Sequence, residues 1–118
     1  MPRTLISSDA IPPPAGPYSP ALDVDGWIFL AGQGGDGDTI EDQTEAALAS
    51  VAALLEAAGC SLDDVVSTLV HLRDLSDFER YNAVYERHFS EPRPVRTTVG
   101  ASLLGSLLIE ITVVARRP

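Results

Sequence analysis

The sequence predicts a single α+β domain in which two helices pack on one face of one sheet. Three observations support this prediction: β-prone runs precede, separate and follow two helical patterns, the chain has 118 residues, and hydrophobic residues make up 45% of it. A chain of this length forms one ordinary domain and buries roughly two-thirds of its unfolded surface on folding. We therefore treat residues 1–118 as one domain with its own core.

The first third of the chain has strand patterns interrupted by proline and glycine. Thr4–Ile6 is β-prone, whereas residues 11–20 contain too many prolines for a helix or a central strand and predict an arm. The runs Ala21–Val24 and Trp27–Ala31 are separated by Asp-Gly, which favours a tight antiparallel hairpin. The glycine-rich segment 32–38 lacks the lysine of a phosphate loop and the ligand spacing of a calcium loop, so we interpret it as a connection.

A long helix is predicted between residues 39 and 59. Thr39 can cap its start, and the acidic residues of the first turn complement the helix dipole. Gly59 is of the type that ends helices in a left-handed conformation. Apolar residues at helical spacing predict a buried stripe formed by Leu48, Val51, Leu55 and Ala58.

The second half of the chain predicts a strand, a second helix and two further strands. Val65–Leu72 is almost continuously β-prone, which favours a strand covered on both faces. A capping-box pattern from Ser76 to Glu79 predicts a helix start near residue 77, and prolines 92 and 94 end that helix. Its aromatic residues have helical spacing and predict a core-facing stripe, with a ligand wall as the second interpretation: Phe78, Tyr81, Tyr85 and Phe89.

The last two strands, Val95–Ser102 and Leu107–Arg116, are predicted to pair as a hairpin because only four residues separate them. Alternation along this hairpin places Arg96 and Glu110 on the same side of the sheet. The pattern alone favours a solvent-exposed ion pair that contributes roughly 1 kcal/mol or less.

The charge balance argues against anionic partners. Seventeen acidic and eight basic residues give a net charge of −9, which repels nucleic acid and anionic lipid surfaces. Arg116 and Arg117 are interpreted as an exposed, solubilising end. No apolar run reaches membrane-spanning length and no signal-peptide pattern is present, so we expect no membrane partner and a cytoplasmic location.

Metal, disulfide and thiol chemistry are not expected. Cys60 is the single cysteine, so it has no partner for a disulfide within the chain, and no neighbouring positive charge stabilises its thiolate. His71 and His88 are far apart in the sequence, which disfavours a zinc site. We therefore expect a half-buried, inert thiol and no metal.

Five short motifs occur in order along nearly the whole chain: Gly16-Pro-Tyr-Ser19, Ala31-Gly-Gln33, Asn82-Ala-Val-Tyr-Glu86, Pro94-Val-Arg-Thr-Thr-Val99 and Ile109-Glu-Ile111. Together they resemble the RidA/YjgF family of imine deaminases. The resemblance implies a chorismate-mutase-like fold and a homotrimer, with a cleft wherever the open sheet faces of neighbouring subunits meet.

The same resemblance implies a cofactor-independent 2-iminobutanoate/2-iminopropanoate deaminase. Such enzymes hydrolyse reactive enamines and imines, such as 2-aminoacrylate and 2-iminobutanoate, to 2-keto acids and ammonia. The implied site residues, each with its role, are Arg96 binding the substrate carboxylate, Glu110 activating water, Tyr18 closing the pocket, Gly32 and Thr98 presenting backbone polar groups, and Asn82 supporting the wall. If Arg96 and Glu110 pointed to opposite sides of the sheet, this deaminase interpretation would be contradicted.

Several departures from the family leave the substrate open. Ala31 stands where many members have serine, and Thr98 stands where many have cysteine. The segments from Gln33 to Thr39 and from Asn82 to Arg96 are shorter than usual, which reshapes the pocket mouth. The alternative is a non-catalytic protein that binds or senses a carboxylate metabolite. The presence of Glu110 beside Arg96 favours the enzyme, and the acidity of the chain disfavours RNA cleavage.

Overall fold

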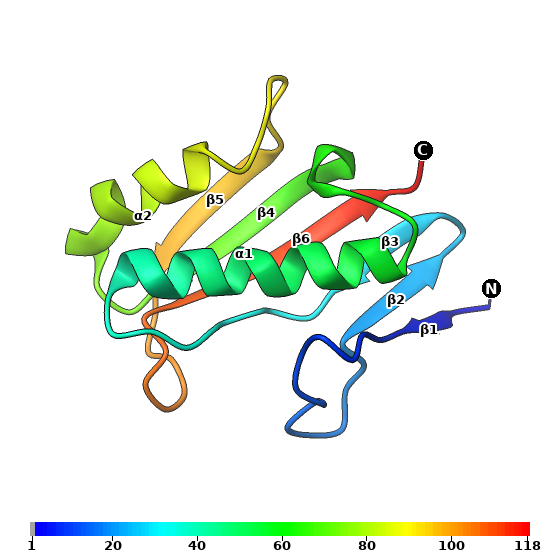
Figure 1. The fold of residues 1–118 in the computed structure, drawn as a ribbon, viewed down its shortest axis with the longest axis horizontal. Coiled ribbons are helices and arrows are strands. Elements are labelled where there is room, and N and C mark those ends of the chain that lie inside the picture. The colour runs from blue at the N-terminus through cyan, green and yellow to red at the C-terminus, as the bar shows by residue number, and fades with distance from the viewer. Residues whose placement is uncertain (1) are drawn as a thin grey trace.

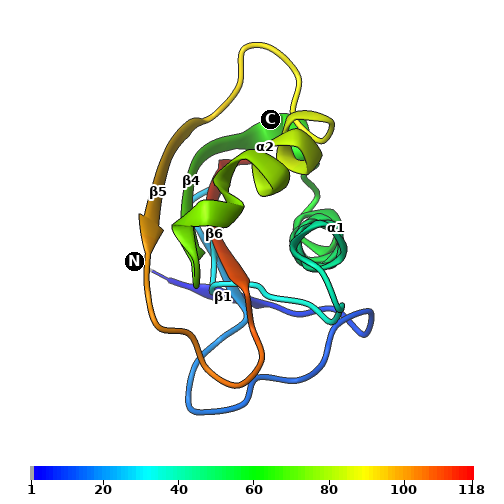
Figure 2. The same ribbon diagram turned by 90° about the vertical axis from the view of Figure 1, so that its left-hand side faces the viewer.

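A computed structural model describes residues 2–118 and contains one six-stranded sheet with two α-helices on the same face (Figure 1). Figure 2 gives the edge-on view, in which α1 and α2 lie on one side of the strands. The predicted α+β class is confirmed. The strands are β1 (Thr4–Ile6), β2 (Ala21–Val24), β3 (Trp27–Leu30), β4 (Val65–Leu72), β5 (Val95–Gly100) and β6 (Ile109–Arg116), the helices are α1 (Ile40–Ala57) and α2 (Phe78–Glu86), and two 3-10 turns are η1 (Leu62–Asp64) and η2 (Leu75–Asp77).

The predicted C-terminal hairpin is wrong. The sheet order is β1-β2-β3-β6-β4-β5, so β4 lies between β5 and β6. β4 pairs in parallel with β5 and antiparallel with β6, because α2 provides the crossover that parallel neighbours require. The segment 101–108 is therefore a wide loop rather than a tight turn (Figure 1). Arg73 holds this loop by donating hydrogen bonds of 2.8, 3.0 and 2.7 Å to the carbonyls of Leu103, Gly105 and Leu107.

The predicted β2–β3 hairpin is confirmed. Val24 pairs with Trp27, which leaves a two-residue turn. Asp25 and Gly26 both have positive φ, at 58° and 84°. Aspartate and glycine tolerate this conformation, and its twist matches the two flanking strands.

Helix α1 also begins and ends as the sequence predicts. The Thr39 side chain accepts a hydrogen bond from the Asp42 backbone amide at 3.1 Å, and Gly59 has a positive φ of 78° just beyond the helix. The stripe of four apolar residues is buried against the sheet: Leu48, Val51, Leu55 and Ala58. This stripe forms the centre of the core.

The predicted capping box at Ser76 is wrong, although the helix starts close to the expected position. Asp74 accepts a hydrogen bond from the Ser76 amide at 2.9 Å and begins the 3-10 turn η2, so α2 starts one turn later at Phe78 without a side-chain cap. The capping box in this chain is instead at Ser61 and Asp64. The aromatic stripe of α2 is buried except for its first member, Phe78.

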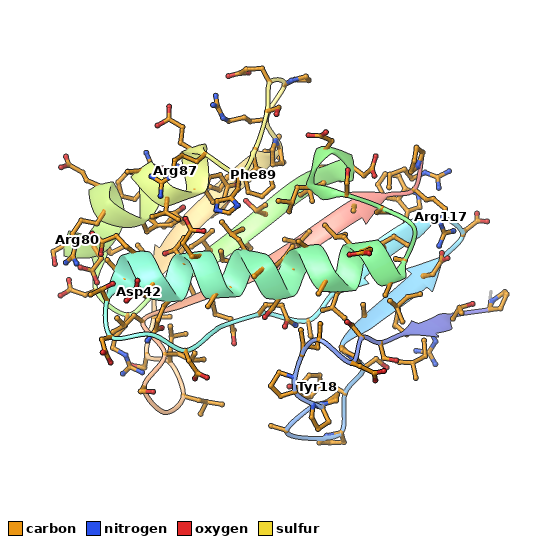
Figure 3. The ribbon with its side chains drawn as sticks, viewed as in Figure 1. Tyr18, Asp42, Arg80, Arg87, Phe89 and Arg117 are labelled. Carbon is orange, nitrogen blue, oxygen red and sulfur yellow. The ribbon has the colours of Figure 1, made fainter. Side chains whose placement is uncertain are left out.

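The C-terminal arginines are not a free solubilising end. Arg117 is half-buried, donates to the Ala58 carbonyl at 3.0 Å and pairs with Asp23, so it connects the end of α1 to β2 (Figure 3). Arg116 lies 5.3 Å from the ring centroid of Trp27. Both residues therefore act in the fold.

The face of the sheet opposite the helices is uncovered and apolar. The prediction that β4 is covered on both faces is wrong for the described chain, since Leu69 is exposed while its neighbour Val70 is fully buried. By strand register, the exposed apolar side chains of this open face are Leu5, Trp27, Phe29, Leu69, Val95 and Val99. Exposed apolar side chains gathered on one sheet face are typical of an interaction site.

Candidate functional site

Arg96 lies on the edge strand β5, and its side chain faces the helices. Its register partner on β4 is the buried Thr68, and paired residues share a face of the sheet. Its Nη1 donates a hydrogen bond of 2.7 Å to the Asn82 side-chain oxygen on α2. Its guanidinium carbon lies 4.8 Å from the Tyr85 ring centroid and 5.4 Å from that of Tyr81. It also lies 5.7 Å from the Phe78 ring centroid. One hydrogen bond and three cation–π contacts therefore fix its position.

The two tyrosines that hold Arg96 are themselves fixed. Their hydroxyls form hydrogen bonds of 2.8 Å, Tyr85 with Thr68 and Tyr81 with Thr98. Burial raises the pKa of both phenols above the usual value, while these hydrogen bonds and the charge of Arg96 oppose the shift. Both tyrosines therefore remain neutral hydrogen-bonding groups at physiological pH, and Arg96 lies against a rigid aromatic wall.

A pocket of about 340 Å³ opens beside this arginine. Its size is at the lower end for small-molecule sites, which suits a metabolite rather than a polymer. A guanidinium presents its N–H groups in a planar fork, and this geometry matches a carboxylate. The pocket can therefore bind a small carboxylic acid. The lining residues are Asn82, Tyr85, Glu86, Arg93, Pro94 and Arg96.

Glu110 lies on the other face of the sheet, so the predicted shared face is wrong. Its register partner on β4 is His71, which alternates with the buried Val70 and Leu72 and therefore faces the open side. The error follows from the missing hairpin, because the expected register assumed direct pairing of β5 with β6. Within one chain, the deaminase interpretation that requires Arg96 and Glu110 on one side is contradicted.

Gly32 provides the contact that positions the Glu110 side chain. A Cβ atom at position 32 would lie 2.7 Å from the carboxyl carbon of Glu110, closer than any normal contact. Glycine at this position therefore lets the glutamate lie directly on the backbone. Gly32 and Glu110 form one local unit on the open face.

Tyr18 belongs to neither group within one chain. It lies on the proline-rich arm, is 54% exposed, and accepts a hydrogen bond of 3.3 Å from the Ala15 amide. In Figure 3 it lies across the molecule from Phe89, whose ring is 4.6 Å from that of Tyr85 in the Arg96 pocket. Tyr18 cannot close that pocket in its own chain.

The structure therefore divides the predicted site residues into two groups and one separate residue. Arg96 and Asn82 line the pocket, and Thr98 supports it through Tyr81. Glu110 and Gly32 lie together on the open face. The pocket is also lined by Glu86, Arg93 and Pro94, for which the sequence predicts no site role.

A signal for part of this wall was present in the sequence. Asn82, Tyr85 and Glu86 are spaced by three and four residues, so they share one face of α2. Arg93 comes from the loop before β5, and no helical or strand periodicity predicts where such a residue lies.

The single cysteine lies in surroundings that disfavour its thiolate. Burial raises the pKa of the half-buried Cys60 thiol, and the nearby Asp64 charge adds to this effect. Within residues 2–118, no three His, Cys, Asp or Glu side chains are grouped as metal ligands. Over the same residues, every helix is too short or too polar to cross a membrane.

Comparison with known proteins gives matches over almost the whole chain. The family described as Endoribonuclease L-PSP matches residues 8–117. A RutC family protein of Saccharolobus solfataricus is 40% identical over 124 residues, which covers 98% of each chain. A 2-iminobutanoate/2-iminopropanoate deaminase of Dermatophagoides farinae is 34% identical and 87% of each chain is covered.

Solved structures have the same fold. The crystal structure of RidA from an Antarctic Psychrobacter matches with a TM-score of 0.92 and 34% identity, covering 96% of this chain and 98% of that one. A yeast protein structure matches with a TM-score of 0.95 and 29% identity, covering 99% of this chain and all of the other.

Proposed function

The chain belongs to the Endoribonuclease L-PSP family, which includes RutC and RidA proteins, and we propose that it hydrolyses small imino and enamine acids to 2-keto acids and ammonia. The resemblance to RidA/YjgF proteins drawn from the motifs is confirmed, and some relatives are named as deaminases of reactive intermediates. The observation that carries the proposal is the fixed Arg96 guanidinium in a pocket of metabolite size.

Arg96 binds the α-carboxylate of the substrate. Its Nη1 is occupied by Asn82, while its remaining N–H donors are available to a ligand. A carboxylate bound there holds the adjacent C=N carbon at a fixed place in the pocket. Because the aromatic wall already positions the guanidinium, substrate binding needs little reorganisation.

Glu110 comes from a neighbouring subunit. The opposite orientation of Arg96 and Glu110 excludes a site within one chain, so a site that uses both requires two chains. The exposed apolar open face that carries Glu110 favours such a contact. A contact between two different patches of identical chains forms a ring when its rotation closes, and a ring of three chains would be the homotrimer implied by the resemblance.

The reaction needs only a bound carboxylate, a placed water and a proton carrier. Glu110 accepts a proton from water as the oxygen adds to the imine carbon, and the imine nitrogen is protonated to an amine. The C–N bond then breaks as ammonia leaves, and the carbon becomes the carbonyl of the 2-keto acid. One water is consumed for each ammonia released.

Subunit complementation tests both the activity and the two-chain site. Arg96→Ala and Glu110→Gln are each expected to lose keto-acid formation from 2-iminobutanoate generated in the assay. When the two variants are co-expressed with different tags, about three quarters of the trimers are hybrids with one intact cleft in three. Activity should therefore return to about a quarter of the wild-type value.

The matched control co-expresses Arg96→Ala with Arg96→Lys. No hybrid cleft then contains an arginine at position 96, so no activity should return. If the Arg96→Ala and Glu110→Gln mixture stays inactive although hybrids form, the two-chain site is wrong. If wild-type protein does not turn over the imines, the deaminase proposal is wrong.

A non-catalytic carboxylate-binding protein remains the second candidate. The specific observation in its favour is that one chain alone provides Arg96 and its pocket without Glu110. A protein of this kind would bind 2-oxobutanoate without hydrolysing the corresponding imine. Binding measured by calorimetry together with the turnover assay separates the two functions.

A further inference from the structure

The Arg96 pocket contains a second guanidinium. Arg93 lines the same pocket from the loop between α2 and β5, one residue before Pro94. The positive charges of Arg96 and Arg93 both act to lower the pKa of the Tyr85 hydroxyl, against the larger effect of burial. The two arginines therefore act on the same wall of one small cavity.

Most other arginines already have roles in the fold. Arg73 donates to three loop carbonyls, Arg80 forms two hydrogen bonds with Glu41, and Arg117 joins α1 to β2. Arg93 differs, because its ion-pair partner is Glu91 on the same exposed loop.

The ion pair between Arg93 and Glu91 is exposed enough for a ligand to take the place of Glu91. The side chains of Arg93 and Glu91 are 39% and 77% exposed. An ion pair this exposed contributes little to stability. A ligand carboxylate held in the pocket can therefore replace Glu91 at little cost.

The net charge of the pocket lining is positive and favours an anion. Arg93 and Arg96 bring two positive charges, and Glu86 brings one negative charge. The bound α-carboxylate neutralises the charge of Arg96. The charge of Arg93 then favours a negatively charged group on the substrate side chain. A planar guanidinium can donate paired N–H contacts to a carboxylate, so Arg93 is suited to a second carboxylate on the substrate side chain.

We propose that Arg93 makes the site selective for imino acids with a second carboxylate, namely the imino forms of four- and five-carbon amino dicarboxylic acids. This rests on the proposed function, because Arg96 must bind the α-carboxylate. The chemistry is unchanged: water adds to the C=N carbon, ammonia leaves, and a keto diacid is formed. Arg93 acts as a specificity residue and takes no proton.

Binding of stable keto acids tests the selectivity without depending on catalysis. Calorimetry at fixed salt compares 2-oxoglutarate with 2-oxobutanoate. We expect wild-type protein to bind 2-oxoglutarate about tenfold or more tightly than 2-oxobutanoate, as a charge-assisted contact predicts. In Arg93→Gln this ratio should fall to about one.

Arg87→Gln is the matched control, since it removes the same charge from the C-terminal end of α2, outside the pocket (Figure 3). The ratio should stay at the wild-type value in this variant. A wild-type ratio near one, a ratio that survives in Arg93→Gln, one lost in Arg87→Gln, or absence of binding by both keto acids would overturn the inference.

The turnover assay tests the deaminase activity separately from the selectivity that we assign to Arg93. Selective binding of the keto diacid without imine hydrolysis would refute the deaminase activity but support the role of Arg93. Hydrolysis of 2-iminobutanoate with no preference for a diacid would support the activity and refute the selectivity.

Discussion

Replacing Gly32 with alanine should displace the Glu110 carboxylate without disturbing the fold. The new Cβ would lie 2.7 Å from the carboxyl carbon and 2.8 Å from the Cγ of Glu110. Carbon atoms in contact are normally about 3.5–4.0 Å apart, so the carboxyl group must move by about 1 Å. Glu110 is the flexible partner in this contact, and it can turn away at little cost in stability.

The expected catalytic cost is large. A misplacement of about 1 Å at a catalytic group reduces the rate by about 100-fold. This factor corresponds to about 2.7 kcal/mol of lost transition-state stabilisation. We therefore expect Gly32→Ala to lower kcat/KM for 2-iminobutanoate by about 100-fold, with little change in the Tm.

Gly35→Ala is the control, because this glycine substitution should disturb the fold rather than the position of Glu110. Its Cβ would lie 2.3 Å from the Ala46 Cβ and 2.9 Å from the Ala46 carbonyl carbon, in the backbone of α1. This variant should lose thermal stability. Thermal unfolding and steady-state kinetics on both variants separate the two effects. Wild-type kcat/KM in a folded Gly32→Ala protein would refute the role given to the position of the Glu110 carboxylate.

Two further substitutions test the positioning of Arg96 and the end of the fold. Asn82→Asp should raise KM more than Asn82→Ala, because a carboxylate beside Arg96 competes with the substrate; equal KM values would contradict this. The hydrogen bond from Arg117 lowers the pKa of Asp23 below 3.8, so this contact stabilises the fold above that pH. In urea unfolding, Arg117→Gln should be less stable than wild type at neutral pH, and the difference should shrink below about pH 4.

Local sequence signals predict the parts of the fold that are set by neighbouring residues. The Asp25-Gly26 turn, the Thr39 cap and the Gly59 helix end each depend on residues within one turn of the chain. The buried stripe of α1 follows from a repeat over several turns, which the packing of a single helix face requires. These features can be predicted from sequence because each is set by the chemistry of residues that lie close together along the chain.

Strand pairing depends on distant residues, and here the prediction from sequence fails. The short distance between the last two strands favours a hairpin, but β4 takes the place between them because α2 returns the chain parallel to it. Arg73 lies about thirty residues from the loop carbonyls that it binds, so the local pattern around 101–108 gives no sign of this contact. The same wrong pairing of β5 with β6 is the reason why Arg96 and Glu110 were predicted to lie on one face of the sheet.

The predictions of site residues succeed and fail for the same reason. Arg96 and Asn82 were assigned from resemblance and do meet, because a strand and the helix before it pack together within one crossover unit. Arg93 was missed since it lies on a loop, and loops carry functional residues without periodic patterns. Tyr18 lies on an exposed arm away from the pocket of its own chain, and no periodic pattern in this proline-rich segment predicts where its side chain lies.

In the deaminase mechanism that we propose, the separation of Arg96 from Glu110 makes assembly a condition of the chemistry. An isolated chain would leave Glu110 on a water-exposed sheet face among uncovered apolar residues, where a carboxylate has no substrate to act on. A neighbouring chain that covers this face removes apolar surface from water and at the same time brings the carboxylate to a bound imine. On the proposed two-chain site, the same contact would stabilise the assembly and complete the site, so we expect a substitution that weakens the open-face contact to reduce activity even when Arg96 and its pocket are intact.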